Sequence, residues 1–388
     1  MRRLLPLAAA AAALALPRVA AAASATPLDW SMDAATVTRT CAAEMSKTGA
    51  RVRAIARPRP AGTAYTFANT VLPLENAIAD ENDALAAQQF LSSVAPSKAV
   101  RDASLACDTK VEDELSGLTA LPSLAAAVDL AAASATAKTV YEKKLTDLWV
   151  ETLHRSGAQI PAQHHLEYLN LEATLHDVEN RFGQNLADDT TTIQLSERQM
   201  SGISNDMLAG FAHANGGYAV PVNSGTYEFL TQSTNEDARR AYYIAFNNRA
   251  AAANVPLLER AILVRDRLAH LLGYESWADY RLADRMAGTP ARVEKFIATT
   301  TTALQPAVAS QIDAMQAAVR AEDRDAHATL QPWDVKRGEY LVAKAHAVDG
   351  NAIRQYFPVQ HTIDAVLDVY HTLLGVTFEQ VAPADAWA

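Results

Sequence analysis

The stretch LAHLLGYESWADYRLADRMAGTP, residues 268–290, is the most specific pattern in this sequence. It begins with a leucine-rich helical segment that should end at Gly273, because glycine readily adopts the left-handed conformation that closes a helix. It ends with Thr289-Pro290, and these residue types are favoured at the N-cap and in the first turn of a helix. The stretch therefore predicts two helices joined by a defined connection.

Helical patterns continue on both sides of this stretch. From Tyr141 to Leu153 apolar residues recur at steps of three and four with charged residues between them, which predicts an amphipathic helix that stops at Gly157. A second helix should begin near Pro161 and end before Gly183. Further helices are predicted at 235–272, 289–321, 333–347 and 362–374.

Strand signals are few. Thr190 to Leu195 and Tyr218 to Val222 are short segments of strand-forming composition, and they are the only strands that the sequence predicts. The alanine-rich stretch Leu121 to Lys138 fits either a helix or a poorly packed linker. We therefore predict a mainly α fold with at most a small β element.

Composition limits the fold and the partners. The chain has 388 residues, of which 49% are hydrophobic and only 15 are glycine, which argues against a turn-dense all-β fold and against a low-complexity chain. Its formal net charge is −10, so it lacks the basic field that non-specific nucleic-acid binding needs. We expect no nucleic-acid partner.

The N-terminus resembles an export signal. Arg2 and Arg3 precede an apolar, alanine-rich run and a group of small residues ending at Ala25, which predicts a signal peptide over residues 1–25. The alternative is an alanine-rich disordered arm. A signal peptide implies an exported protein, periplasmic or extracellular. The later apolar segment 118–137 contains Pro122 and Asp129, so no membrane span is expected after signal cleavage.

The sequence contains two cysteines, Cys41 and Cys107. In an exported protein such a pair is a disulfide candidate, whereas two buried free thiols are the alternative. Their wide spacing excludes a CxxC redox or zinc motif.

Signatures of catalysis and of metal binding are absent from the sequence. It has no G-x-G-x-x-G after a strand, no phosphate-binding loop, no G-x-S-x-G and no His-Glu-x-x-His. Glu151 and His154 form a single Glu-x-x-His unit, whereas helical di-iron proteins need this unit twice. We interpret His164-His165 and the pair His361 and His371 as surface or packing residues.

Glu172, His176 and Glu179 share one face of the helix predicted to begin near Pro161, because they are four and three residues apart. We interpret them as a solvated polar face opposite the apolar stripe of this helix, rather than as metal ligands. The sequence therefore assigns no catalytic residue and no metal ligand in this chain.

The stretch 268–290 closely resembles the thimet oligopeptidase, oligopeptidase A and peptidyl-dipeptidase Dcp family of zinc peptidases. In that family a leucine-rich helix ends at Leu-Gly-aromatic and is followed by a Tyr, by Asp-Arg-Met-Ala and by a Thr-Pro that starts the next helix. The resemblance covers roughly residues 140–388 and, less clearly, 70–140. Other fragments fall in the family's order: Arg155-Ser156-Gly157, Phe182 to Leu186, Tyr227 to Leu230, Arg239 to Tyr243, Asn248-Arg249, Pro332-Trp333-Asp334, Tyr356-Phe357-Pro358 and Leu373 to Phe378.

The resemblance implies the function of the intact enzyme. Family members are zinc-dependent peptidases that admit short peptides into a deep channel between two largely helical halves. Their His-Glu-x-x-His helix lies C-terminal to the segment that matches the end of this chain, near Trp387. The resemblance therefore implies an N-terminal helical region, 26–139, and an oligopeptidase-like region, 140–388, truncated before the zinc-binding segment. Zinc and peptide hydrolysis belong to the intact enzyme, and this chain alone is predicted to be inactive.

One local departure concerns the helix that follows Trp333-Asp334. Family members usually carry an aromatic pair shortly after this Trp-Asp, where this chain has Arg337-Gly338. The packing of this helix is therefore left open by the sequence.

Two other functions are compatible with the sequence. One is a non-catalytic peptide-binding or scaffold protein that kept one wall of the family's channel. The other is an unrelated helical metal-binding bundle based on Glu151 and His154. In the family interpretation, a half that normally packs against a catalytic partner should expose apolar helix faces such as Val366, Tyr370 and Leu373, so self-association is expected.

Overall fold

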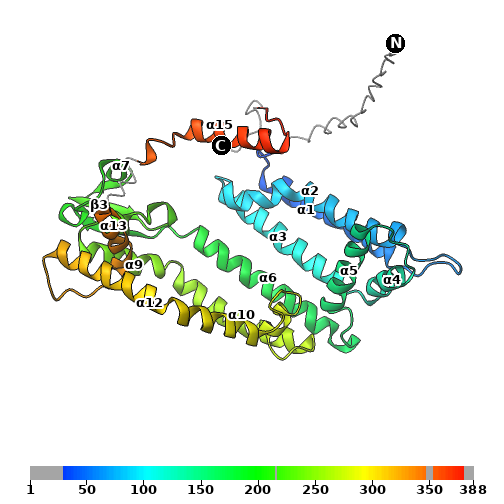
Figure 1. Ribbon diagram of the computed structural model, residues 1–388. Coiled ribbons are helices and arrows are strands. Elements are labelled where there is room, and N and C mark those ends of the chain that lie inside the picture. Colours follow the sequence, from blue (N-terminus) through cyan, green and yellow to red (C-terminus); the bar gives the residue numbers. More distant parts are fainter. Residues whose placement is uncertain (1–28, 215, 347–352, 380–388) are drawn as a thin grey trace, which may run out of the picture.

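The computed structural model describes residues 29–214, 216–346 and 353–379, so the predicted signal peptide 1–25 lies outside the described residues. The described part is mainly helical and contains a three-stranded antiparallel sheet. The predicted mainly α fold with a small β element is confirmed. Along the chain, a helical bundle is followed by a long helix (His165–Ala187), by a mixed region that holds the sheet, and by a second long helix (Ala251–Leu271) (Figure 1). The predicted boundary between the two regions, 26–139 and 140–388, coincides with the start of a helix at Val140. The division into these two regions stays a prediction.

The N-terminal bundle contains three long helices that pack along one another and two shorter ones at one end (Figure 1). Its helices are α1 (Ala34–Ile55), α2 (Leu72–Val94), α3 (Lys98–Thr119), α4 (Pro122–Ala133) and α5 (Val140–Arg155). Side-chain caps fix several helix starts: Asp33 accepts a hydrogen bond from the backbone of Thr36 at α1, and Thr139 and Glu142 form a capping box at α5.

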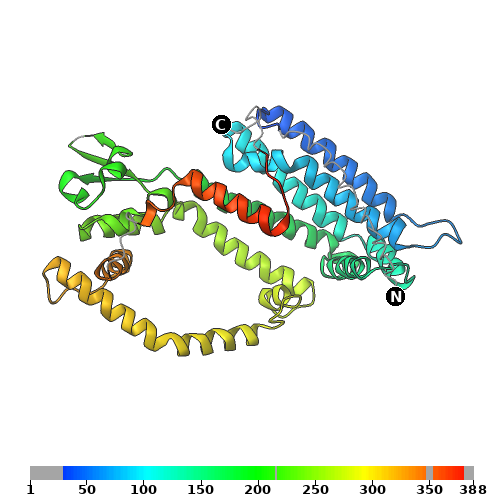
Figure 2. The same ribbon diagram turned by 45° about the horizontal axis from the view of Figure 1, so that its top comes forward.

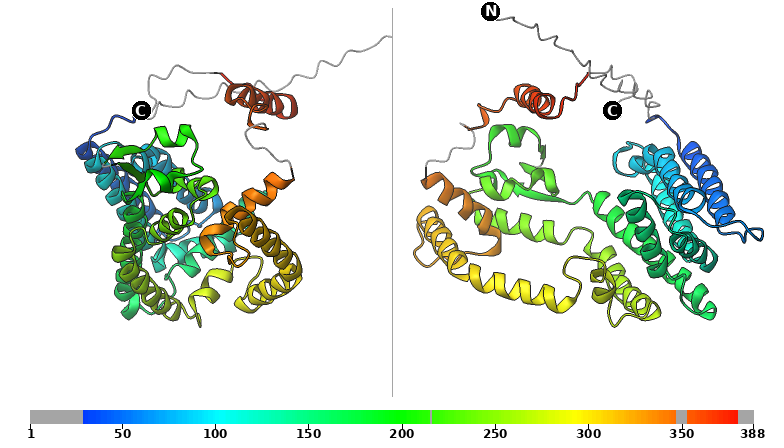
Figure 3. Two further views of the ribbon diagram at one scale, coloured as in Figure 1. Left: turned by 90° about the vertical axis from the view of Figure 1, so that its left-hand side faces the viewer. Right: turned by 45° about the vertical axis from the view of Figure 1, so that its right-hand side comes forward.

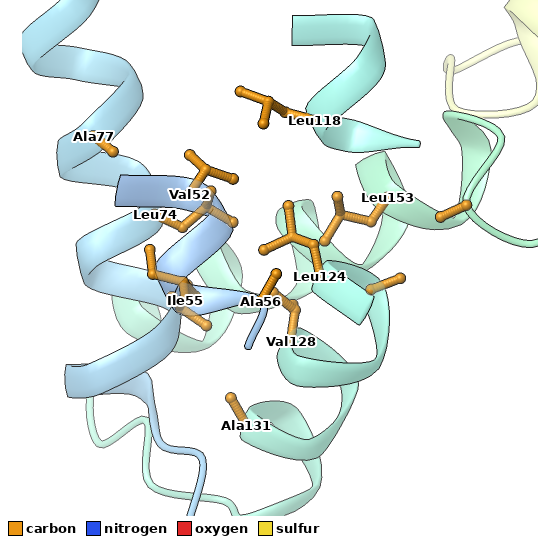
Figure 4. Close-up of a cluster of buried hydrophobic side chains, with 13 residues drawn as sticks. Val52, Ile55, Ala56, Leu74, Ala77, Leu118, Leu124, Val128, Ala131 and Leu153 are labelled. Atoms are coloured by element: carbon orange, nitrogen blue, oxygen red, sulfur yellow. The ribbon is translucent and has the colours of Figure 1, made fainter. Parts of the chain in front are cut away.

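Apolar side chains from all parts of the bundle meet where α4 and α5 cover its end. Val52, Leu74 and Leu153 are fully buried there, and Leu124 and Val128 of α4 pack among them (Figure 4). The alanine-rich stretch that begins at Leu121 therefore folds as a helix, because it contributes these side chains to the core.

Two long helices connect the bundle to the sheet region. α6 (His165–Ala187) packs against α3 on one side and along α10 (Ala251–Leu271) on the other (Figure 1). The prediction that α6 ends before Gly183 is wrong. Glycine costs a helix interior about 1 kcal/mol relative to alanine, and the packing of α6 against two neighbouring helices outweighs that cost.

The helical stretch predicted at 235–272 consists of two helices, α9 (Glu236–Asn247) and α10. The chain turns between them at Ala250, whose φ of 52° lies in the left-handed region. No glycine or proline marks this break in the sequence, so periodicity alone does not place it.

The sheet contains β1 (Thr192–Ser196), β3 (Gly217–Pro221) and β2 (Ala212–Ala214) in the order β1-β3-β2, all antiparallel. β1 and β3 are the two predicted strands. β2 was not predicted, because it has only three residues and none of them is β-branched. The sheet region also holds the short helices α7 (Asn205–Ala209) and α8 (Phe229–Gln232).

The three helices that follow α10 form an open ring with it (Figure 2). α11 (Trp277–Leu282) follows α10, the 34-residue helix α12 (Pro290–Asp323) runs back, and α13 (Val335–Ala345) packs near the end of α12 (Figure 2). α15 (Val359–Leu374) lies apart from the other described helices and buries none of its residues (Figure 3).

Among the described helices, no single one is long and apolar enough to cross a membrane. Within the part of the chain that the structure describes, α3 and α4 taken together reach the necessary length and composition, and they are bent by 61° relative to each other.

Candidate functional site

The connection between α10 and α12 has the local structure that residues 268–290 predicted. Gly273 adopts a φ of 84° after α10, and the backbone N–H of Tyr274 donates to the carbonyl of Ala269 at 2.9 Å. Thr289 caps α12 by accepting a hydrogen bond from the backbone of Arg292, and Pro290 is its first residue. The predicted helix end and helix start are both present.

Arg155, at the end of α5, ties this connection to the N-terminal bundle. Its Nη2 donates to the backbone carbonyl of Tyr280 at 2.6 Å and lies 3.7 Å from Oδ1 of Asp284. Its guanidinium also lies over the Tyr280 ring, 5.0 Å from the centroid. Two fragments that are 125 residues apart in the sequence therefore meet at one side chain.

A buried ion pair joins two other fragments of the family pattern. Nε and Nη2 of Arg239 donate to Oδ1 of Asp334 at 2.9 and 2.7 Å, and Nη1 donates to the carbonyl of Ser233. Arg239 is fully buried and Asp334 is 1% exposed. Sequence reasoning quoted both fragments but did not pair them.

Arg337 and Gly338, whose packing the sequence left open, hold α13 against its neighbours. Nε of Arg337 donates to Oε2 of Glu322 at 2.9 Å, and Nη1 donates to the carbonyl of Thr231 at 2.9 Å. A Cβ at Gly338 would lie 2.9 Å from Cβ of Met315 in α12, closer than side chains normally approach. This pair of residues therefore gives α13 a polar anchor to α8 and a close approach to α12.

Among the described residues, the Glu-x-x-His unit of α5 is not joined by further side chains into a metal-binding group. Nε2 of His154 lies 2.9 Å from Oδ1 of Asp129 in α4, and Glu151 is exposed. Among the described residues, no three His, Cys, Asp or Glu side chains are arranged to hold a metal ion. Because a catalytic zinc ion needs three protein ligands, these residues do not form a zinc site.

The other histidines singled out in the sequence have local partners. Nε2 of His165 lies 3.0 Å from the carbonyl of Ile160, and Nδ1 of His164 lies 3.4 Å from Glu167. Nδ1 of His371 lies 2.9 Å from the carbonyl of Val376, while His361 lines a groove on α15.

The interpretation of Glu172, His176 and Glu179 as a solvated polar face is wrong for Glu172 and His176. The side chains of Glu172 and His176 are only 14% and 16% exposed, because this face of α6 packs against α3 and lies close to α11. Burial raises the pKa of the Glu172 carboxyl. Glu179 is exposed and pairs with Arg265 of α10 at 2.6 Å.

The two cysteines meet between α1 and α3. Cys41 and Cys107 are joined by a disulfide with a Cα–Cα distance of 5.9 Å, and both are buried. They border a hollow of about 290 Å³ that Met45, Lys110 and Glu114 also line. Formation of this disulfide in exported material stays a prediction.

Two helices present apolar faces that the described residues leave uncovered. α15 and the turn before it form a groove of about 600 Å³, lined by Tyr356, Phe357, His361, Thr362, Ala365, Val366, Val369, Tyr370, Leu373 and Leu374. On α12 the exposed apolar residues are Phe296, Ile297, Leu304, Val308 and Ile312. Exposed apolar faces of this kind mark interaction surfaces in soluble proteins.

Comparison with known proteins gives a consistent result. Residues 229–388 match the sequence model of Peptidase family M3. The probable thimet oligopeptidase of Arabidopsis thaliana is 23% identical over 328 residues, which are 83% of this chain and 46% of that protein. Oligopeptidase A of Salmonella typhimurium is 25% identical over 268 residues, 63% of this chain and 38% of that protein. A mitochondrial intermediate peptidase of Pyricularia oryzae is 24% identical over 243 residues.

These matches define the class that the chain resembles: it is similar to the M3 peptidases, and the resemblance predicted from residues 268–290 is confirmed. The proteins to which it is similar include thimet oligopeptidase, oligopeptidase A and mitochondrial intermediate peptidase. The chain spans less than half the length of these two relatives.

Proposed function

We propose that this chain is the N-terminal part of an exported, zinc-dependent oligopeptidase that cleaves short peptides, and that the chain alone is inactive. The match of residues 229–388 to the M3 family carries this proposal. The predicted signal peptide 1–25 supports export.

The inactivity follows from the chemistry of the family. Zinc polarises the scissile carbonyl and lowers the pKa of a bound water when three protein ligands hold it with one position open. The described residues of this chain contain no such set of ligands. In the proposed enzyme this part supplies a helical wall, and the zinc ligands come from a segment that follows it.

The uncovered apolar faces of α12 and α15 support the same proposal. α12 buries a single residue, Val319, and α15 buries none, although both carry apolar residues at helical spacing. Covering these faces with further polypeptide would remove their apolar side chains from water and stabilise both helices.

The test combines the gene with an activity measurement. The nucleotide sequence downstream of codon 388 should continue, in frame or after a frameshift, into a segment encoding His-Glu-x-x-His. The polypeptide that includes this segment should cleave a quenched-fluorescence peptide in a chelator-sensitive manner, whereas the chain alone with added zinc should not. Chelator-sensitive hydrolysis that follows the chain alone through purification would contradict the proposal, and a stop with no such motif nearby would favour the scaffold alternative.

Export is tested separately. Material recovered from outside the cytoplasm should begin at Thr26, as N-terminal sequencing would show. A protein that retains Arg2 and Arg3 and stays in the cytoplasm would contradict this part of the proposal.

A further inference from the structure

α12 carries an apolar face that the described residues cover at one end of the helix. At the C-terminal end Val319 is buried, and Gly338 of α13 approaches Met315 closely. The same face continues toward the start of α12, because residues at steps of three, four and seven share one side of a helix. Four large apolar residues lie there, all of them exposed, and we call them the α12 stripe: Ile297, Leu304, Val308 and Ile312.

The part of α12 that carries the stripe also lacks charge. Residues 296–312, FIATTTTALQPAVASQI, contain no aspartate, glutamate, lysine or arginine, and all of them except Thr300 are exposed. A helix that stays in water normally presents charged residues on its solvent side. Between the large apolar residues lie mainly alanine and threonine, whose short side chains let a second helix approach closely. This part of α12 therefore has the composition of a packed helix.

α15 offers a surface that matches the α12 stripe. Its groove of about 600 Å³ is lined along the helix by Val366, Val369 and Leu373. None of the described residues that line the groove is an aspartate, glutamate, lysine or arginine. At 1.5 Å per residue, the stripe from Ile297 to Ile312 spans about 22 Å, and the 16 residues of α15 span about 24 Å. The two apolar surfaces thus agree in length and in their lack of charge.

Within the described part of one chain these two surfaces do not meet. α15 lies apart from α12 in both views of Figure 3. A second copy of the chain can bring its α15 to the α12 stripe, and a twofold arrangement then brings together both surfaces of both copies.

We propose that α15 of one copy packs on the α12 stripe of a second copy, and that this exchange is reciprocal and forms a dimer. The side chains of the stripe enter the α15 groove, and removal of both apolar surfaces from water drives the association. The inference does not rest on the proposed function, because it uses only surfaces of this chain.

Two double variants each remove one of the two surfaces. Val366→Lys with Leu373→Lys places charge in the α15 groove, and Leu304→Lys with Val308→Lys places charge on the α12 stripe. Each variant alone should dimerise at least about 100-fold more weakly than the wild type, because the dimer would bury lysine ammonium groups without partners. Sedimentation equilibrium measures the dissociation constants. All four positions are exposed in the single chain, so the fold should be retained, which circular dichroism checks.

Ala303→Lys with Ser310→Lys is the matched control on α12. Both positions are exposed and lie on the other side of the helix from Leu304 and Val308. This variant adds the same charge and should dimerise as the wild type does. Equal weakening by the control and by Leu304→Lys with Val308→Lys would contradict a role of the stripe.

A mixture of the two double variants distinguishes this dimer from other modes of association. The α15 variant keeps an intact α12 stripe, and the α12 variant keeps an intact α15. The mixture should therefore form a 1:1 complex through one remaining contact, although each variant alone is monomeric at the same concentration. Pairing of α15 with α15 would leave the α12 variant dimeric and give no such complex. Docking of α15 on α12 within one chain would leave the wild type monomeric, and either result would overturn the proposal.

Discussion

Arg239 and Asp334 are buried together near the start of α13, so neither can exchange its partner for water. Burying an ion is costly, and the pair is tolerated because each of the three guanidinium nitrogens makes a hydrogen bond. Exposed ion pairs in the same region contribute far less, because water already solvates both of their members. Lys336 and Glu339 of α13 are such a pair, 2.8 Å apart.

Asp334→Ala should therefore strongly destabilise the protein. The substitution leaves the Arg239 charge buried without a counter-ion, and removal of one member of a buried pair typically costs about 3–5 kcal/mol. The free energy of unfolding from urea titration measures this cost. Glu339→Ala, which removes one member of the exposed pair on the same helix, should cost at most about 1 kcal/mol. Equal losses in the two variants would show that burial does not determine the effect.

Gly338→Ala should also destabilise the protein, for a steric reason. The new methyl group would lie 2.9 Å from Cβ of Met315, an atom that cannot move without the backbone of α12. Overpacking of this kind costs roughly 1–3 kcal/mol. Gly183 of α6 is the matched control, because a Cβ there meets no atom within 4 Å.

Gly183→Ala should instead stabilise the protein by roughly 0.5–1 kcal/mol, since alanine is the better helix former. Thermal unfolding of both variants gives the comparison. A stabilised Gly338→Ala variant would contradict the close approach of α13 to Met315 of α12.

Among the helices, those with a clear apolar stripe were the ones that the sequence placed well. α5 and α12 begin and end within a few residues of their predicted bounds, because caps and periodicity agree there. α6 continues past Gly183, before which the sequence predicted its end, because tertiary packing overrides the low helix propensity of one residue. The burial of Glu172 and His176 was not predicted because it depends on packing against α3. Asp113 of α3, which contacts His176, lies 63 residues earlier in the sequence.

Stability of the α1–α2–α3 bundle should depend on pH through Glu81. Burial, together with the nearby carboxylates Glu114 and Glu44, raises the pKa of Glu81 to about 7. A carboxyl whose folded pKa lies above its unfolded value stabilises the fold while it is protonated, and this contribution is lost as pH rises. The stability contributed by protonated Glu81 should therefore be lost between pH 4.5, the ordinary pKa of glutamate, and about pH 7.

Glu81→Gln isolates this effect, because glutamine imitates the protonated carboxyl. The variant should match the wild type in melting temperature at about pH 5 and exceed it by several degrees at about pH 8. Differential scanning calorimetry at the two pH values is the measurement. A variant that is equally destabilised at both pH values would show that the Glu81 carboxylate makes a stabilising contact instead.

The burial of apolar side chains differs between the parts of the molecule. The bundle, the α6–α10 pair and the sheet region each enclose a cluster of buried side chains. α12 and α15 instead leave large apolar residues exposed, among them Leu304, Val366 and Leu373. The family resemblance was predictable from the sequence because it rests on local motifs, whereas the buried pair of Arg239 and Asp334 depends on segments 95 residues apart.

The exposed groove on α15 should make the chain self-associate when it is alone. A helix of 16 residues is marginally stable in water by itself, and burying its apolar side chains against another apolar surface lowers the free energy. Light scattering coupled to gel filtration should therefore give a mass that rises with protein concentration above 41.7 kDa, the mass of the full sequence.

Val366→Lys combined with Leu373→Lys should restore the monomer, because both side chains line the groove. The combination Gln360→Lys and Thr372→Lys adds the same charge at exposed positions outside the groove and should leave association unchanged. A wild-type chain that stays monomeric and melts cooperatively would contradict the expectation and would favour a self-sufficient scaffold protein.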